Sequence, residues 1–242
     1  MGQADAWLWG VTLGDQPVGQ GKMTDAAIRD AATLILLRRG GAGLSVLMGQ
    51  RGAGAAFMPG KFVFPGGAVD EGDALAPLAL PLDATCVTRL GAQSRADPAA
   101  LAAAAIRELW EEAGLRLGLS APWPDPPADW QGFARGGHRP AGNALSFIFR
   151  AITPPGNPRR FDARFFLAEA TALIGDPDDF SAASDELNHL QWVPLDHLRG
   201  FDLPFITEIV LAEVAALAGR EGPPPSVPFF DNSGPEPRFH RL

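Results

Sequence analysis

Three glutamates, Glu108, Glu111 and Glu112, stand close together in the stretch "AAIRELWEEAGL" and are the residues best suited to chemistry. On an α-helix each residue advances by about 100°, so spacings of three and four residues bring these carboxylates together on one face. Like charges at these spacings repel and raise one another's pKa. A hard divalent cation would relieve the repulsion, since Mg²⁺ takes oxygen ligands and usually keeps waters for substrate phosphates. A solvated acidic helix face is the alternative.

A second acidic stretch, "FPGGAVDEGDA" at residues 64–74, places a Pro-Gly-Gly turn directly before Asp70, Glu71 and Asp73. Because glycine lacks Cβ, such a turn lets the backbone approach a metal site closely. Asp70 and Glu71 fit two interpretations, a cation site or plain loop solubility. The two stretches therefore leave two interpretations open: a metal site that joins a glycine turn to an acidic helix, or two solvated acidic segments.

These two stretches together resemble the signature of the Nudix hydrolases, which reads Gly, five residues, Glu, seven residues, then Arg-Glu-aliphatic-x-Glu-Glu-x-Gly-aliphatic. The second half is matched without exception by Arg107, Glu108, Leu109, Glu111, Glu112, Gly114 and Leu115. Two departures stand in the first half. Asp73 replaces the family's glutamate, and the shorter side chain is expected to alter its contact with Arg107. Residues 74–106 then separate the two halves, 33 residues where seven are usual, an insertion of 26.

An interrupted signature is similar to one branch of that family, the peroxisomal coenzyme-A-cleaving Nudix enzymes and their bacterial relatives. "AITPPGNPRRFDARFFLAEA" resembles a strand motif of the same branch, and the resemblance runs from about Asp30 to Ala218. Arg51 fits an arginine motif that precedes the glycine turn in coenzyme-A-type members. Ala56 stands where a second arginine is expected, and Arg159 and Arg160 are the candidates to replace its charge. The resemblance thus implies Arg51 and Arg160 as substrate-binding residues.

The resemblance implies a hydrolase that cleaves the pyrophosphate of a nucleoside diphosphate linked to another group, with Mg²⁺ as cofactor and Mn²⁺ as the alternative ion. Coenzyme A or acyl-coenzyme A is the favoured substrate. An ADP-sugar or dinucleotide pyrophosphatase is one alternative, and a non-catalytic nucleotide-sensing Nudix domain is another. Such sensing domains often lose signature glutamates, and this chain keeps all three. The sequence therefore favours an enzyme.

The resemblance also implies roles for individual residues. Metal binding falls to Glu108, Glu111, Glu112 and the carbonyl of Gly66, and the catalytic set is Arg107, Glu111, Glu112 and Glu186. Arg107 would hold the glutamates in orientation. Glu186, in "SDELNHLQWVPL", matches the loop position of the general base in many members, with Asp185 as runner-up. The alternative for both residues is a surface loop carboxylate.

The acidic face needs a helix to carry it, and "DPAALAAAAIRELWEEAG" predicts one. Asp97 can cap its first turn, Pro98 suits the first helical position, and Gly114 suits the stop. The opposite face is apolar and can enter a core; it consists of Ala102, Ile106, Leu109 and Ala113. "LPFITEIVLAEVAALAG" predicts a second helix.

Strands are predicted around these helices. "AATLILLRRGGAGLSVLMGQR" predicts a β-hairpin with a glycine-rich turn, and further strands are expected in "GKFVFPGG", "LSFIFRAIT", "RRFDARFFLAEA" and "LQWVPLDHL". The order of strands, helix, strands and helix favours an α/β protein. With the resemblance, we expect a Nudix-type α/β/α sandwich with a mixed β-sheet and an insertion between the glycine turn and the acidic helix.

The remaining segments are expected to be irregular. Residues 1–27 form an N-terminal extension, residues 28–220 the Nudix hydrolase domain, and residues 221–242 a Pro-rich tail draped over the surface. The insertion, about 74–96, is expected to form a lid or wall over the substrate. Residues 120–142 are rich in Pro and Gly, so regular structure is not expected there.

Composition sets limits on partners. The chain has 242 residues and a formal net charge of −8, so a whole-chain basic footprint for nucleic acid is absent, and an anionic substrate needs local cations. Cys86, the single cysteine, cannot form an internal disulfide and suits a reducing compartment. No stretch approaches the ~20 apolar residues of a membrane span. We expect a cytoplasmic protein whose partner is a small nucleotide; the sequence does not set the oligomeric state, for which a homodimer is the candidate.

Overall fold

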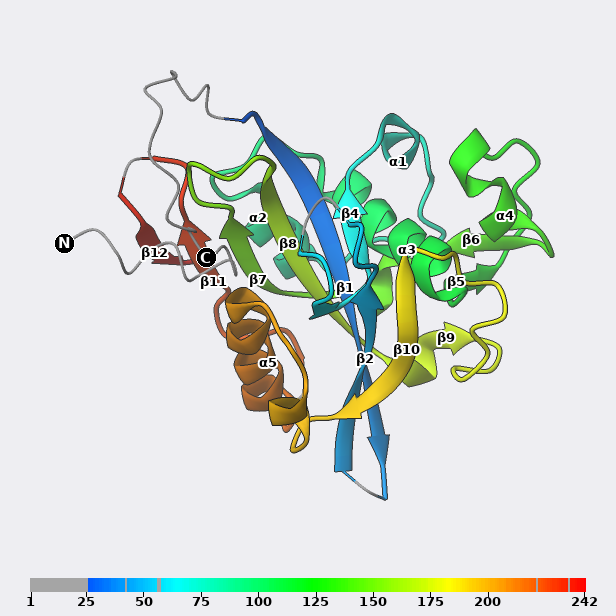
Figure 1. Ribbon diagram of the computed structural model, residues 1–242. Helices are drawn as coiled ribbons and strands as arrows, with labels where there is room; N and C mark the ends of the chain where they lie inside the picture. Colours follow the sequence, from blue (N-terminus) through cyan, green and yellow to red (C-terminus); the bar gives the residue numbers. More distant parts are fainter. Residues whose placement is uncertain (1–25, 42, 56–57, 221, 235) are drawn as a thin grey trace.

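A mixed β-sheet forms the centre of the computed structural model, which describes residues 26–242 except 42, 56, 57, 221 and 235 (Figure 1). Its strand order is β10-β2-β1-β8-β7-β11-β12, with β3 paired to β2 and β4 paired to β1. These strands are β1 (Ile28–Gly40), β2 (Gly43–Arg51), β3 (Phe62–Val63), β4 (Gly66–Ala68), β7 (Ser146–Ile152), β8 (Arg160–Glu169), β10 (Leu187–Pro194), β11 (Pro228–Asp231) and β12 (Arg238–Arg241). β1 runs parallel to β8 and antiparallel to β2, which confirms the expected mixed α/β fold.

Helices cover both faces of this sheet (Figure 1). They are α1 (Glu71–Ala74), α2 (Ala84–Gly91), α3 (Pro98–Ala113), α4 (Gln131–Ala134) and α5 (Phe205–Leu217). Side chains of β1 alternate between two cores: Leu34 and Leu36 pack in the core that contains α2 and α3, whereas Ile35 and Leu37 pack in the core that contains α5. This period of two, with both faces buried, makes β1 the central strand of the sandwich.

Local signals set the ends of α3. The side chain of Asp97 accepts a hydrogen bond from the Ala99 N–H at 3.0 Å, Pro98 occupies the first turn, and Gly114 ends the helix in the left-handed conformation with a φ of 72°. A Cβ at Gly114 would also meet the backbone of Ala182 at 2.9 Å. The predicted apolar face is fully buried, with Ala102, Ile106, Leu109 and Ala113 at 0% exposure. Helix and hairpin are therefore where the sequence predicts them.

The insertion contains a helix that packs against α3 and β7. Residues 84–91 form α2, where the Asp83 side chain accepts from the Thr85 N–H at 2.8 Å and Cys86 and Leu90 are buried against α3 and β7. Among the described residues, none from 74–96 lines the pocket of about 370 Å³ that lies beside Arg107 and Glu112. Part of this segment instead completes the core beside α3, where Ala76, Leu82, Cys86 and Leu90 are buried, whereas Leu75, Leu80 and Val87 are exposed. The structure therefore gives no support to the expectation of a wall over the substrate.

Residues 120–142 also contain regular structure, contrary to expectation. They include β6 (His138–Pro140), which joins β5 (Arg116–Ser120) and β9 (Leu173–Ile174) in a small sheet, together with α4. Trp130 and Phe133 are fully buried, with ring centroids 5.3 Å apart, and pack over Trp110 of α3. Burial of these aromatic rings outweighs the local preference of Pro and Gly for loops. Short 3₁₀ turns cover Ala128–Trp130, Gly142–Ala144, Ala170–Ala172 and Leu198–Gly200.

The C-terminal segment extends the sheet rather than draping over the surface. β11 pairs in parallel with β7, and β12 pairs with β11. Val227 and Phe229 are buried, and the guanidinium of Arg150 lies 4.1 Å from the centre of the Phe229 ring. The expectation of a surface tail is therefore wrong. Most of the N-terminal extension, residues 1–25, lies outside the described residues, and within the described part no helix is long and apolar enough to cross a membrane.

Candidate active site

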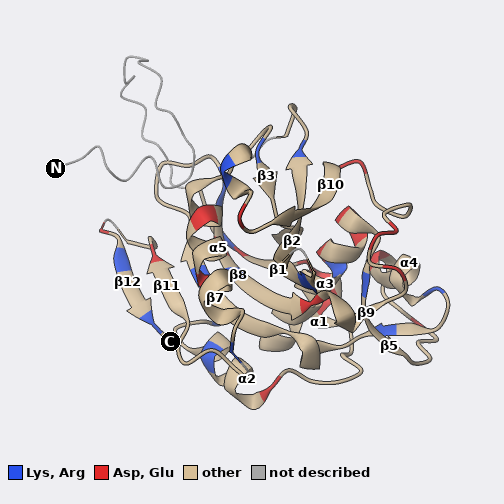
Figure 2. Cartoon of the chain, turned by 90° about the horizontal axis from the view of Figure 1, so that it is seen from below, with Lys and Arg blue, Asp and Glu red and all other residues tan. Residues whose placement is uncertain are grey.

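A pocket of about 370 Å³ opens where α3, β4 and the paired strands β1 and β8 meet. The carboxylates that line it come from α3, from the segment before β10 and, at Asp70, from the turn before α1. Arginines from β1, β2, α3 and the β7–β8 turn line it too. Figure 2 shows the acidic segments of α1 and α3 close together, away from β11 and β12. The pocket therefore combines acidic and basic side chains from segments far apart in the sequence.

Arg107 is the organising cation of the acidic side. It is 4% exposed, and its Nε and Nη2 donate to the two oxygens of Asp73 at 2.8 and 3.0 Å. Its Nη1 donates to Glu108 at 3.0 Å and to Glu111 at 2.9 Å, while Nη2 also donates to the Ala68 carbonyl at 2.9 Å. One guanidinium thus fixes the orientation of two glutamates and ties α3 to β4.

The contact between Asp73 and Arg107 is intact, although a shorter side chain was expected to alter it. Asp73 lies in the short helix α1, and its side chain is completely buried. Its Oδ2 also accepts a hydrogen bond from the Asp70 N–H at 2.9 Å. The turn of α1 brings the backbone close enough for an aspartate to make the bidentate pair, so the missing methylene is compensated by position.

The glycine turn serves the site in two ways. The Gly66 N–H donates to Glu112 Oε2 at 2.8 Å. A Cβ at Gly67 would overlap the carboxylate of Glu108. Gly66 has no room either, because a Cβ there would lie 2.8 Å from the Ala32 carbonyl oxygen. Glycine is required at both positions because the turn passes directly against α3 and β1.

Burial disfavours the charged form of the three glutamates on α3, and the nearby positive charges do not offset it. Burial, followed by the charge of Glu108, raises the pKa of Glu112 to about 8. The hydrogen bond from the Gly66 N–H and the charge of Arg51 oppose this rise. Burial also raises the pKa of Glu108 to about 7, although Arg107 opposes the shift. Burial likewise raises the pKa of Glu111. For Arg107, burial alone would lower the pKa, but Asp73 and the glutamates raise it well above its usual range.

These residues fit a divalent cation in donor chemistry and in charge, since hard cations take carboxylate and carbonyl oxygens. Within the described part of the chain, however, no three His, Cys, Asp or Glu side chains are already gathered closely enough to hold a metal ion. Arg107 and the Gly66 N–H instead hold the carboxylates through the hydrogen bonds described above. A cation would therefore draw together oxygens that already line one pocket.

The structure gathers most of the predicted site residues and leaves one out. Those that line the pocket are Arg51, Gly66, Arg107, Glu108, Glu111, Glu112 and Glu186. Arg160 does not; it is 3% exposed, and its guanidinium donates to the Thr153 carbonyl at 3.0 Å and the Asn232 carbonyl at 2.7 Å. The prediction that Arg160 binds substrate conflicts with this position, and its neighbour Arg159 lines the pocket instead.

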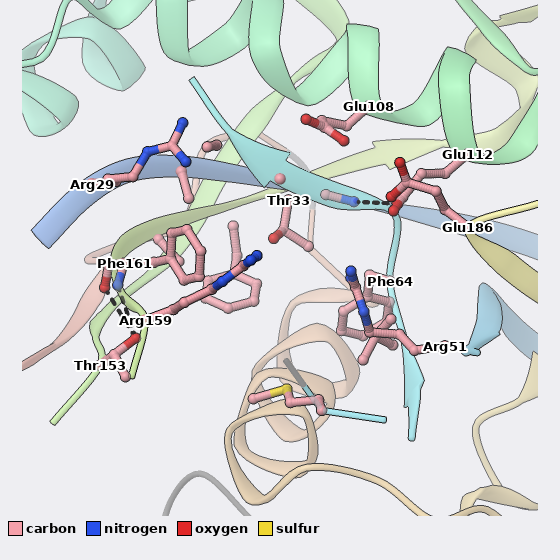
Figure 3. A pocket seen from close by; sticks show the side chains of 18 of the residues that line it. Arg29, Thr33, Arg51, Phe64, Glu108, Glu112, Thr153, Arg159, Phe161 and Glu186 are labelled. Carbon is pink, nitrogen blue, oxygen red and sulfur yellow. Dashed lines mark hydrogen bonds between the residues drawn. The ribbon is translucent and has the colours of Figure 1, made fainter. Parts of the chain in front are cut away.

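Several lining residues were not singled out by the sequence, among them Arg29, Thr153 and Phe161. Arg29 lies opposite Phe161 in the parallel pairing of β1 with β8. That pairing joins segments more than a hundred residues apart, so no local pattern indicates it. Asp185, the runner-up for general base, is not among the described lining residues, whereas Glu186 lies beside Glu112 (Figure 3).

Comparison with known proteins gives likenesses in sequence and in fold. No protein-family model matches the chain. A curated Caenorhabditis elegans protein with the provisional name nudix hydrolase 7 is 32% identical over 187 residues, which cover 72% of this chain and 53% of that protein. The chain thus spans about half the length of this relative.

A solved structure shows the same fold. The crystal structure of a NUDIX hydrolase from Alicyclobacillus acidocaldarius superposes with a TM-score of 0.58 at 29% identity, covering 83% of this chain and 99% of that one. In this chain, Arg107, Glu108, Glu111 and Glu112 lie around the glycine turn through the hydrogen bonds described above. Sequence and fold thus both show a likeness to proteins named as Nudix hydrolases.

Proposed function

We propose that this chain is a divalent-metal-dependent hydrolase that cleaves the pyrophosphate of a nucleoside diphosphate linked to another group. The observation that carries the proposal is the convergence of Glu108, Glu111, Glu112 and Glu186 on one pocket that also presents arginines. Carboxylates suit a metal and a general base, and arginines suit phosphate oxygens. A purely solvated acidic face would not be 2% exposed at Glu112.

The three glutamates of α3 and the carbonyl of Gly66 would hold the cation, with Mg²⁺ favoured and Mn²⁺ as the alternative. When bound, such an ion neutralises charge on phosphate oxygens and acidifies a bound water. Arg107 keeps Glu108 and Glu111 oriented through its hydrogen bonds at 3.0 and 2.9 Å. Arg107 is therefore a positioning residue in this proposal.

Glu186 is the proposed general base. It approaches the pocket from the loop before β10, beside Glu112 and outside the Arg107 network (Figure 3). A carboxylate with this freedom can accept the proton of the water that attacks a phosphorus atom, while the departing phosphate carries away the bonding electrons. Asp185 is a weaker choice because it is not among the described lining residues.

Coenzyme A or acyl-coenzyme A is the substrate class we favour. Arg51 supports an anionic substrate, because its Nε is buried without a hydrogen-bond partner among the described residues, and its side chain lines the pocket. An ADP-sugar or a dinucleotide is the alternative, since any of them presents a pyrophosphate. A non-catalytic nucleotide sensor is disfavoured by the presence of all the signature glutamates together with Glu186 in one pocket.

A substrate screen tests this function. Coenzyme A, acetyl-coenzyme A, ADP-ribose and diadenosine polyphosphates would each be incubated with the protein and Mg²⁺ or Mn²⁺, and the products identified by mass. We expect metal-dependent cleavage at a pyrophosphate, giving 3′,5′-ADP and 4′-phosphopantetheine from coenzyme A. Turnover of ADP-ribose alone would overturn the coenzyme A assignment, and binding without cleavage of any compound would favour the sensor.

A further inference from the structure

The pocket is chemically divided into an acidic side on α3 and a basic side at the β7–β8 turn. Figure 3 shows Glu108, Glu112 and Glu186 on one side, whereas Arg159, Thr153 and Phe161 lie on the other. The Arg159 side chain extends from the turn toward Thr33, in the middle of the pocket. A volume of about 370 Å³ is within the range of about 300–1,000 Å³ that holds a drug-sized ligand. The pocket thus has room for a ligand that extends from the glutamates to the Arg159 side chain.

The turn that carries Arg159 is firmly held. Thr153 and Phe161 form two hydrogen bonds with each other. The Thr153 N–H donates to the Phe161 carbonyl at 2.9 Å, and the Phe161 N–H donates to the Thr153 hydroxyl at 3.0 Å. Arg160 binds the Thr153 carbonyl at 3.0 Å and the Asn232 carbonyl at 2.7 Å, and the Asn232 side chain donates to the Ile152 carbonyl at 2.9 Å. The C-terminal segment therefore fixes the backbone on both sides of Arg159, so a ligand need not order the turn.

Arg159 itself makes no hydrogen bond or ion pair with any residue that the structure describes, and this separates it from Arg107 and Arg29 in the same pocket. Arg107 forms ion pairs with Asp73, Glu108 and Glu111. Nη2 of Arg29 lies 3.6 Å from Oδ1 of Asp70. In a protein with a net charge of −8, a guanidinium without a carboxylate partner is a local attractor for an anion.

We propose that Arg159 binds a second phosphoryl group of the substrate, outside the pyrophosphate that is cleaved. This inference rests on the proposed function for the identity of the pyrophosphate. A phosphomonoester carries about −1.5 to −2 charges at pH 7, and an internal phosphate of a polyphosphate chain carries about −1. Both accept the paired N–H groups of an arginine. Two kinds of nucleotide present it: one with a phosphomonoester on the ribose, as in coenzyme A, and one with a longer phosphate chain, as in a dinucleoside polyphosphate.

Paired substrates test the proposal. kcat/KM would be measured for coenzyme A against dephospho-coenzyme A, and for diadenosine tetraphosphate against diadenosine diphosphate, with wild type, Arg159→Ala and Arg159→Lys. Arg95→Ala is the matched control, since Arg95 is exposed, lies outside the pocket and changes the net charge equally. In one of the two pairs, we expect the kcat/KM of wild type to be about tenfold or more higher for the member with the additional phosphate, coenzyme A or diadenosine tetraphosphate. This is the size of a charge-assisted bidentate contact.

Arg159→Ala should reduce that ratio to about one, because kcat/KM should fall only for the member with the additional phosphate. Arg159→Lys should keep part of the preference, because lysine offers a single charge without the paired N–H groups of a guanidinium. The pair that responds identifies the source of the phosphate. Arg95→Ala should leave both ratios unchanged. No preference in wild type, an equal fall for both members of a pair, or a preference that survives Arg159→Ala would overturn the proposal.

A binding measurement separates this proposal from the proposed function. Calorimetry would compare the dissociation constant of 3′,5′-ADP with that of AMP, and that of adenosine tetraphosphate with that of ADP. The difference within each pair measures the contribution of the additional phosphate to binding, without any cleavage. If no compound is hydrolysed but the extra phosphate tightens binding through Arg159, the hydrolase assignment fails and the Arg159 site stands. If hydrolysis proceeds and neither ratio nor affinity depends on Arg159, the site fails and the hydrolase stands.

Discussion

Gly67 is the residue whose replacement tests the glycine turn most selectively. A Cβ there would overlap the carboxylate of Glu108, which is the far end of a flexible side chain, so the side chain rather than the backbone should move. We expect Gly67→Ala to fold normally while hydrolysis falls by about 100-fold, the cost of misplacing a group by about 1 Å. Gly91→Ala is the control, because a Cβ at that position would meet nothing within 4 Å. Full activity of Gly67→Ala would show that the orientation of Glu108 does not matter.

Asp73 tests what holds Arg107 in place. Asp73→Asn keeps the shape but removes the charge that pairs with a guanidinium only 4% exposed. Breaking one side of a buried pair typically costs about 3–5 kcal/mol of unfolding free energy, and the remaining glutamates should bring the loss toward the lower figure. Urea unfolding measures it. Asp97→Asn is the matched control, since Asn caps a helix as well as Asp does. Equal, small losses in both variants would mean that Asp73 does not anchor Arg107.

The raised pKa of Glu112 should make the unfolding free energy of the metal-free protein depend on pH. Its folded-state pKa is raised to about 8 from an ordinary 4.5, so the folded protein holds a proton that the unfolded chain has already released. The stability from this group is therefore complete below the unfolded pKa and is lost as the pH rises through the folded pKa. With chelator present, the unfolding free energy should fall between about pH 5 and pH 8. Glu112→Gln should show a shallower fall, and parallel curves would contradict the buried, uncompensated charge.

At the scale of elements, α2 is a structural helix behind the sheet. Leu90 is 1% exposed and packs in the core with α3. Leu90→Ala should cost about 2–5 kcal/mol of unfolding free energy and leave KM unchanged, because no residue of α2 is among the described lining residues. Val87→Ala, at a position 41% exposed, is the control and should cost little. A changed substrate preference in a folded Leu90→Ala protein would restore a role for the insertion at the substrate.

Elements with local signals could be predicted from the sequence, and elements set by distant contacts could not. The ends of α3 follow from Asp97 and Gly114, and the acidic face follows from spacing alone. The buried strand β11 depends instead on pairing with β7, and the place of Arg29 in the pocket depends on pairing with β8. The choice between Arg159 and Arg160 likewise depended on Asn232, which lies on the C-terminal segment that was expected to be a surface tail.

At the scale of the whole molecule, the sheet brings opposite charges into one pocket of an acidic protein. β1 and β8 run side by side beneath it, so the residues of the β7–β8 turn face the carboxylates of α3. With a net charge of −8, the molecule as a whole repels an anionic substrate at long range. In the proposed function, binding therefore depends on the local cations and on a metal ion held by the glutamates.

The measurement that tests this claim most directly is thermal unfolding of wild type and Glu112→Gln, each with and without Mg²⁺, alongside hydrolysis. Glutamine keeps the shape of the side chain but removes one anionic ligand at a position 2% exposed. We expect Mg²⁺ at about 100 times its dissociation constant to raise the Tm of wild type by about 5–10 °C. In Glu112→Gln that rise should shrink sharply, and hydrolysis should fall by about 100-fold or more. An equal rise in Tm for both proteins, with hydrolysis intact, would contradict the account.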